Sequence, residues 1–187
     1  MHLLLYISVY SLWIGSEIYL NRFARSGNIQ KKKKDQGSEW ILWITAFVAV
    51  TASSLIAIYS EFAIYLDLQW SLLGLLCMIA GILLRFTAIR QLGKFFTVDV
   101  ILHADHQLIQ TGLYKSLRHP SYTGIMLTLI GFGWSLNHWM SLLIVVSIFF
   151  FALRNRIKIE ENALIEQFGE QYLQYKKKSW KLLPFIY

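Results

Sequence analysis

Two stretches of this sequence carry side chains that could perform chemistry, and each adjoins a long apolar segment. The first covers residues 112–124 and reads Gly-Leu-Tyr-Lys-Ser-Leu-Arg-His-Pro-Ser-Tyr-Thr-Gly. Pro120 lacks an N–H and suits the first turn of a helix, so we expect a helix to begin there. The first amides of that helix would be able to bind an anionic group. A helix start with an interfacial arginine and tyrosine is the purely structural alternative.

The second stretch is the charged tail that follows the last apolar segment. Leu164, Phe168 and Tyr172 recur every four residues, which predicts an amphipathic helix in this tail. Arg156 and Glu160 are also four residues apart and would share one helix face. As an exposed pair they would contribute only about 0.2–0.5 kcal/mol. The alternative is that both charges face a pocket beside the membrane, where ionisable groups usually serve function.

A third polar stretch, residues 99–114, contains a small cluster of potential metal ligands. His103, Asp105 and His106 lie close together in the sequence, but they lack the spacing of a helical motif such as His-Glu-x-x-His. The chain has one cysteine, so a cysteine-based zinc site and an internal disulfide are both excluded. We therefore read this stretch as a loop and predict no metal.

The elements that must position these residues follow from the composition. Hydrophobic residues make up 56% of the 187 residues, charged residues 16%, and the mean hydropathy is +0.45. A soluble domain carries roughly 25% charged residues, so an integral membrane protein is expected. Apolar segments of about 20 residues predict spanning helices. We predict an all-α polytopic fold with five spans, the last two forming a tight hairpin: residues 3–20, 40–59, 70–89, 122–136 and 139–153.

The distribution of basic residues tests this count. Six Lys or Arg fall in residues 22–39, four in 90–121 and seven after residue 153, whereas loops 60–69 and 137–138 have none. The positive-inside rule then places the N-terminus outside and the C-terminus in the cytoplasm. The lysine run is read as a topology signal that contacts lipid headgroups, not as a nucleic-acid site. Glu17 and Arg85 interrupt the first and third spans, and the sequence assigns neither a role.

Taken together, the motifs are far more specific than any one of them. Gly-x-Tyr, Arg-His-Pro-Ser-Tyr-x-Gly, an apolar hairpin, Arg-x-x-x-Glu-Glu and Phe-Gly-x-x-Tyr-x-x-Tyr occur in this order. This half of the chain resembles the isoprenylcysteine carboxyl methyltransferase family of integral-membrane enzymes that use S-adenosylmethionine. The resemblance implies a methyltransferase core in residues 90–187 after three N-terminal helices in residues 1–89. It also implies that Arg156 binds the substrate carboxylate, and that the cofactor is held by His106, Gln107, Leu108, Ile109, Tyr114, His119, Pro120, Ser121, Tyr122 and Glu160.

The residues leave the methyl acceptor open. A carboxylate acceptor is already ionised at neutral pH and needs no base, whereas an amine or thiol would need His119, His106 or Glu161 as one. A phospholipid N-methyltransferase and a small-thiol S-methyltransferase are therefore alternatives. An NADPH-dependent membrane reductase and a non-catalytic membrane protein are further ones. Because the candidate residues lie at the ends of apolar helices, we expect a lipophilic or lipid-anchored acceptor that enters from the bilayer.

Overall fold

The computed structural model describes residues 2–25, 38–64, 68–96 and 107–184, and these residues are almost entirely helical. The long helices are α1 (His2–Arg25), α2 (Ser38–Tyr59), α3 (Ser71–Leu92), α4 (Pro120–Ser135) and α5 (Trp139–Phe168). A short helix, α6 (Glu170–Lys178), and three 3₁₀ turns, η1 (Leu68–Trp70), η2 (Gly93–Phe95) and η3 (Gly112–Lys115), complete the described elements. The predicted all-α polytopic membrane fold is confirmed.

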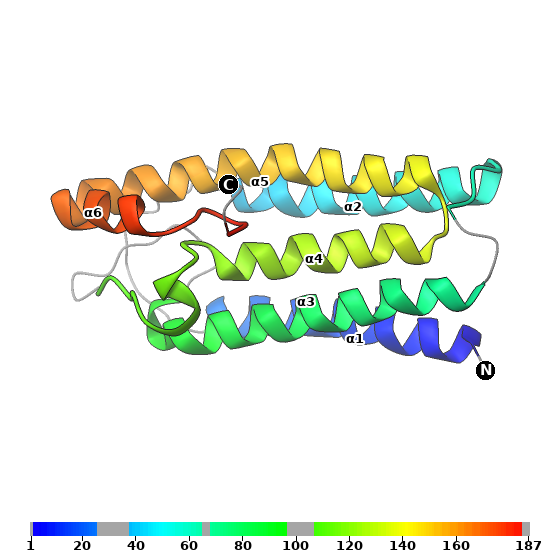
Figure 1. Ribbon diagram of the computed structural model, residues 1–187, viewed down its shortest axis with the longest axis horizontal. Coiled ribbons are helices and arrows are strands. Elements are labelled where there is room, and N and C mark those ends of the chain that lie inside the picture. The colour runs from blue at the N-terminus through cyan, green and yellow to red at the C-terminus, as the bar shows by residue number, and fades with distance from the viewer. Residues whose placement is uncertain (1, 26–37, 65–67, 97–106, 185–187) are drawn as a thin grey trace.

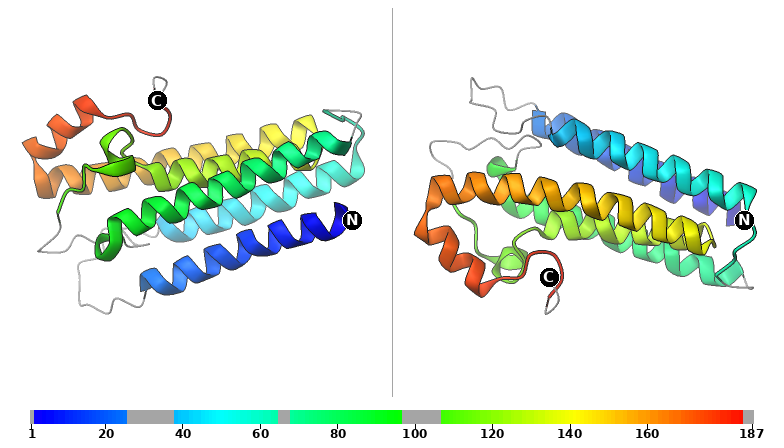
Figure 2. Two further views of the ribbon diagram at one scale, coloured as in Figure 1. Left: turned by 60° about the horizontal axis from the view of Figure 1, so that its bottom comes forward. Right: turned by 90° about the horizontal axis from the view of Figure 1, so that it is seen from above.

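The five long helices lie side by side in two layers (Figures 1 and 2). Helices α3, α4 and α5 form one layer, with α4 in the middle, and α1 and α2 lie behind it. Helix α1 packs on α3, and α2 packs on α5. Three helices, α2, α3 and α5, are long and apolar enough to cross a membrane, and α1 has a shorter apolar part from Leu4 to Leu20. The buried core includes large apolar side chains of α3, α4 and α5: Leu75, Met78, Leu129, Phe132, Val145, Phe149 and Leu153.

Helices α3 and α4 approach closely because glycines face each other at two levels. A Cβ on Gly131 would lie 2.5 Å from the carbonyl oxygen of Gly74, and a Cβ on Gly124 would lie 2.7 Å from that of Gly81. No side chain fits at these distances, so backbone meets backbone. Small residues are the usual means of close helix packing in membranes, where water does not drive the helices together. This packing fixes the start of α4 against the end of α3.

The predicted hairpin between the last two apolar segments is confirmed. Asn137 turns the chain with a φ of 54°, a left-handed conformation that asparagine tolerates. His138 then caps α5, since its Nδ1 accepts the backbone N–H of Ser141 at 3.2 Å. The Nε2 of His138 lies 2.7 Å from the Oγ of Ser60, which joins this end of α5 to the end of α2.

The tail differs from the prediction of one amphipathic helix, because Leu164 and Phe168 belong to α5 and Tyr172 belongs to α6. Helix α5 continues without a break from the apolar segment to Phe168. No glycine or proline occurs between Trp139 and Phe168, so nothing in the sequence stops the helix. It ends at Gly169, whose φ of 52° reverses the chain into α6. Arg156 and Glu160 therefore lie on the same continuous helix as the core residues of α5.

Candidate active site

The start of α4 is built as the motif around Pro120 predicts. Pro120 is the first residue of the helix and is buried. The carbonyl oxygen of His119 accepts the N–H groups of Tyr122 and Thr123 at 3.0 and 3.1 Å, and this closes the first turn. The Oγ1 of Thr123 donates to the carbonyl oxygen of Leu182 at 2.7 Å, so the C-terminal segment lies over this turn.

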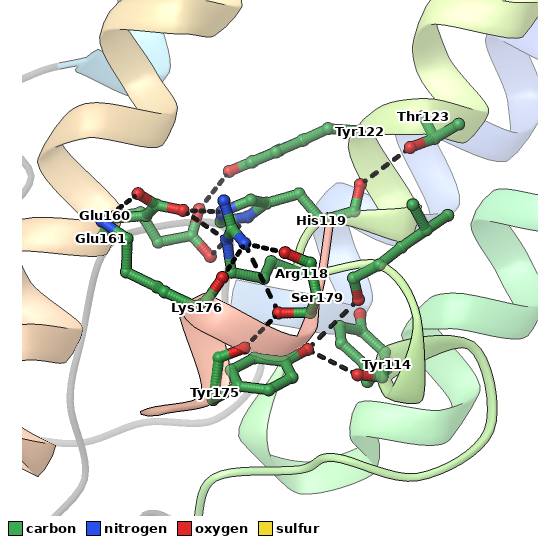
Figure 3. A network of polar contacts seen from close by, with 11 residues as sticks. Tyr114, Arg118, His119, Tyr122, Thr123, Glu160, Glu161, Tyr175, Lys176 and Ser179 are labelled. Atoms are coloured by element: carbon green, nitrogen blue, oxygen red, sulfur yellow. Dashed lines mark hydrogen bonds and ion pairs between the residues drawn. The ribbon is translucent and has the colours of Figure 1, made fainter. Parts of the chain in front are cut away.

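Tyr122 joins the two stretches that the sequence singles out (Figure 3). Its hydroxyl donates to Oε2 of Glu160 at 2.7 Å and lies 3.4 Å from the donating Nε of Arg156. Its ring stacks on the ring of His119, with centroids 5.6 Å apart. The Nδ1 of His119 is 3.7 Å from Oε1 of Glu160. The hydroxyl of Tyr122 therefore connects the N-terminal turn of α4 to α5.

Burial separates the two charged residues on α5. Arg156 is 3% exposed, and its side chain lines a cavity inside the bundle. The side chain of Glu160 is 30% exposed, and this residue does not line that cavity. The prediction that both charges face one pocket therefore stays a prediction. Tyr122 lines this cavity, and its hydroxyl contacts both side chains.

Glu161 is surrounded by cations, an arrangement the sequence does not reveal (Figure 3). Its Oε1 accepts from Nε of Arg118 at 2.9 Å and lies 3.4 Å from Nε2 of His119. Its Oε2 is 3.0 Å from Nζ of Lys176. Arg118 also donates to the backbone carbonyl oxygens of Lys176 and Ser179. Glu161 therefore orients His119 and holds α6 and the segment after it against the start of α4.

Tyr114 is buried beneath α6, and its backbone is fixed from that side. The hydroxyl of Tyr175 donates to the carbonyl oxygens of Tyr114 and Leu117, at 2.6 and 3.2 Å. Burial raises the pKa of Tyr175 to about 12, so this donor keeps its proton at physiological pH. Trp180 and Leu117 form a parallel bridge beside it. The Gly-x-Tyr and Phe-Gly-x-x-Tyr-x-x-Tyr motifs thus meet in space.

The structure places the other predicted cofactor residues as follows. Ser121 is buried and accepts a hydrogen bond from Nη1 of Arg85 at 3.1 Å. Gln107 is exposed, while Leu108 and Ile109 are half-buried in a stretch without regular structure. The polar cluster described above includes none of these three, and His106 lies outside the described residues. In the described part of the chain, no three potential ligands come close enough to hold a metal.

Sequence reasoning left one feature of the site unassigned, the ion pair between Glu17 and Arg85. Nη2 of Arg85 donates to Oε2 of Glu17 at 2.9 Å, and its Nε is 2.9 Å from Oε1. The sequence does indicate such a pair, because Glu17 and Arg85 are each a single charged residue in an apolar segment. Such charges usually pair in the interior of a helical bundle.

Comparisons with known proteins identify the family of this chain. The family model for isoprenylcysteine carboxyl methyltransferase matches residues 72–166. The protein-S-isoprenylcysteine O-methyltransferase of Saccharomyces cerevisiae is 36% identical over 118 residues, which cover 62% of this chain and 49% of the yeast protein. That of Tribolium castaneum is 31% identical over 193 residues, covering 97% of this chain and 65% of the relative.

The fold has a counterpart among solved structures. A eukaryotic intramembrane Ras methyltransferase of the isoprenylcysteine carboxyl type superposes with a TM-score of 0.68 at 26% sequence identity. The match covers 97% of this chain and 65% of that structure. The chain spans about half the length of the first curated relatives it matches, 49% and 52% for the two yeasts.

Proposed function

Since the chain belongs to the isoprenylcysteine carboxyl methyltransferase family, we propose that it is a membrane methyltransferase that uses S-adenosylmethionine to esterify the carboxylate of a lipophilic acceptor. The observation that carries this proposal is the bridge through Tyr122. It links a partly exposed carboxylate, Glu160, to a buried guanidinium, Arg156, that lines an apolar cavity. A site for a water-soluble cation therefore adjoins a site for a lipophilic anion.

The residues at the start of α4 fit the cofactor. The 30% exposure of the Glu160 side chain leaves this carboxylate open to the positive amino group of S-adenosylmethionine. His119 and Tyr122 hold the carboxylate in place from one side. Tyr114, Pro120 and Ser121, three further residues that the resemblance assigns to the cofactor, are buried. When bound, the cofactor supplies a methyl group on a positively charged sulfur.

Arg156 is suited to hold the acceptor. A guanidinium presents a fork of N–H donors that matches a carboxylate, and such charge-assisted pairs are strong where water is excluded. The carboxylate oxygen attacks in its ionised form, so the site needs no base. Glu161 is tied to Arg118 and Lys176 and is poorly placed to accept a proton from an amine or thiol. These contacts count against Glu161 as the base that a phospholipid amine or a small thiol would need.

We further propose that the acceptor reaches Arg156 from the bilayer while the cofactor arrives from the cytoplasm. The cavity is lined mainly by apolar side chains from α1, α2, α4 and α5, and Arg156 is one of its lining residues. The basic segments that flank Glu160 in the sequence support a cytoplasmic position for this end of the bundle by the positive-inside rule. The N-terminus would then lie outside. Small lipophilic acids and lipid-anchored cysteines both match such an entry.

The test is methyl transfer in bilayer nanodiscs with tritium-labelled S-adenosylmethionine and S-alkyl or S-prenyl N-acetylcysteines whose tails increase in length. Burial of the tail contributes about 0.8 kcal/mol per CH₂, so KM should fall with length. Arg156→Ala should lower kcat/KM roughly 10- to 150-fold, the equivalent of losing a charged hydrogen bond. Arg154→Ala is the matched control, because Arg154 is exposed on the same helix.

Two results would contradict the proposal. One is equal turnover by wild type and Arg156→Ala, which would reject the carboxylate site. The other is calorimetric binding of NADPH in place of S-adenosylhomocysteine, which would support the membrane reductase alternative.

A further inference from the structure

Arg85 lies where α3 and α4 are in closest contact. A Cβ on Gly124 would lie 2.8 Å from the backbone nitrogen of Arg85 and 2.9 Å from its Cβ. Ser121 is three residues before Gly124, and residues three apart on a helix share one face. The side chain of Arg85 reaches this face, and its Nη1 donates to Oγ of Ser121 at 3.1 Å. Arg85 therefore connects α3 to the first turn of α4.

Glu17 of α1 holds the other side of the same guanidinium. Nη2 of Arg85 donates to Oε2 of Glu17 at 2.9 Å, and its Nε is 2.9 Å from Oε1. The two side chains are only 13% and 15% exposed, for Arg85 and Glu17 respectively, so water screens this pair weakly. A guanidinium is planar and rigid, so a carboxylate that holds two of its nitrogens also sets the direction of the third. Glu17 thus orients the N–H that Ser121 accepts.

The first turn of α4 carries the residue that connects the two parts of the candidate site. Tyr122 directly follows Ser121, and its hydroxyl contacts both Glu160 and Arg156. Ser121 is buried, so a shift of its backbone cannot occur without moving its neighbours. Arg85, Ser121, Tyr122 and Arg156 also line one cavity. A change at Arg85 would therefore be transmitted to Tyr122 through Ser121.

We propose that Arg85, oriented by Glu17, is a positioning residue that holds the first turn of α4 so that acceptor and cofactor are aligned for methyl transfer. It acts through Ser121 and the adjacent Tyr122. A misplacement of about 1 Å at a reacting centre costs roughly 100-fold in rate, so a contact of this kind affects turnover strongly. The inference rests on the proposed function and gives α1 a part in the site.

The experiment compares three single variants of the full chain in nanodiscs. Arg85→Lys keeps a positive charge opposite Glu17, but an ammonium group lacks the planar fork that spans both partners. Ser121→Ala removes the acceptor of the same hydrogen bond. Arg90→Lys makes the same change at an exposed position of α3 and is the matched control.

Two measurements are made on each protein. The first is kcat at saturating S-adenosylmethionine and acceptor. The second is the fluorine NMR spectrum of 3-fluorotyrosine in place of Tyr122, recorded without cofactor. Arg85→Lys and Ser121→Ala should each lower kcat roughly 10- to 100-fold and shift the fluorine resonance. Arg90→Lys should match wild type in both measurements.

Combined variants test whether these residues act through one contact. Arg85→Lys with Ser121→Ala should have no lower kcat than the more affected single variant, because both changes remove the same hydrogen bond. Glu17→Gln removes the charge that orients Arg85 and should lower kcat and shift the resonance in the same direction. Adding Ser121→Ala to Glu17→Gln should then cause little further loss.

Three results would overturn the inference. The first is a wild-type kcat and fluorine resonance in Arg85→Lys. The second is multiplication of the two losses in the double variant, which would show that Arg85 and Ser121 act independently. The third is a lower melting temperature with unchanged kcat, which would give the pair a purely structural role. Coupled fluorine shifts in a protein that methylates no acceptor would reject the proposed function and leave the positioning of Tyr122 by Arg85 intact.

Discussion

A single added methyl group at the crossing of α3 and α4 should disturb both stability and the site. Gly124→Ala would place a Cβ 2.7 Å from the carbonyl oxygen of Gly81 and 2.8 Å from the backbone nitrogen of Arg85. Ordinary contacts of a Cβ begin at 3.4 Å, so the helices must separate by about 0.7 Å. The atoms to be displaced are backbone, and no side chain can rotate away to relieve the contact.

The magnitude follows from two opposing effects. Overpacking of this kind costs about 1–3 kcal/mol. Replacing a helical glycine by alanine contributes about 0.8–1 kcal/mol in the other direction. Gly15 on α1 provides the reference, because a Cβ there meets nothing within 4 Å. Gly15→Ala should be neutral or stabilising, and Gly124→Ala should be about 1–3 kcal/mol less stable than Gly15→Ala, since the helix-propensity gain cancels in the comparison.

The displacement also reaches the hydrogen bond between Arg85 and Ser121. Its length of 3.1 Å would increase to at most about 3.8 Å, beyond hydrogen-bonding range. Thermal unfolding of both variants in one detergent measures the first effect, and methyl transfer in nanodiscs measures the second. Equal stability of the two alanine variants would refute the close packing of α3 on α4. Full activity of a destabilised Gly124→Ala would refute the link from this packing to the site.

Three other outcomes follow from the structure. In a Cys77→Ser background, cysteines introduced at Ser38 and at Gln69 should be labelled from opposite sides of the membrane, and labelling from one side would contradict the predicted five spans. Glu160→Gln should weaken binding of S-adenosylhomocysteine in calorimetry by about tenfold while the melting temperature changes little, because this carboxylate is partly exposed. The pKa of Tyr175 is about 12 in the fold against an ordinary value of 10, so stability should decrease as pH rises from 10 to 12. Tyr175→Phe should make that decrease shallower, and an unchanged slope would count against the buried phenol.

The elements were predictable because each is encoded locally. The lengths of the apolar segments predict the long helices. Pro120 predicts the start of α4, and the polar pair Asn137 and His138 predicts the turn of the hairpin. The change from apolar to charged residues predicts a helix end at Leu153, whereas α5 continues to Phe168. A helix continues as long as its residues have adequate helix propensity, and the first residue with a poor propensity after Trp139 is Gly169.

Distances between helices were not predictable from one sequence. The pairing of Glu17 with Arg85 joins residues 68 positions apart, and only the packing of α1 on α3 brings them together. The same holds for Tyr122, which the sequence places near the cofactor but not between Glu160 and Arg156. The hydroxyl of Tyr122 contacts both side chains, and Glu160 is more exposed than Arg156.

Because α5 is one continuous helix, it fixes the axial spacing of the residues along it. A helix rises about 1.5 Å per residue, so Phe149 in the cavity lies about 10 Å along the axis from Arg156, and Glu160 lies about 6 Å further. A loop between these residues would let the spacing vary, but a continuous helix does not. Under the proposed function, this fixed spacing would set the distance between the first bulky apolar group of an acceptor and its ionised head. It would also set the distance from that head to the ammonium group of the cofactor.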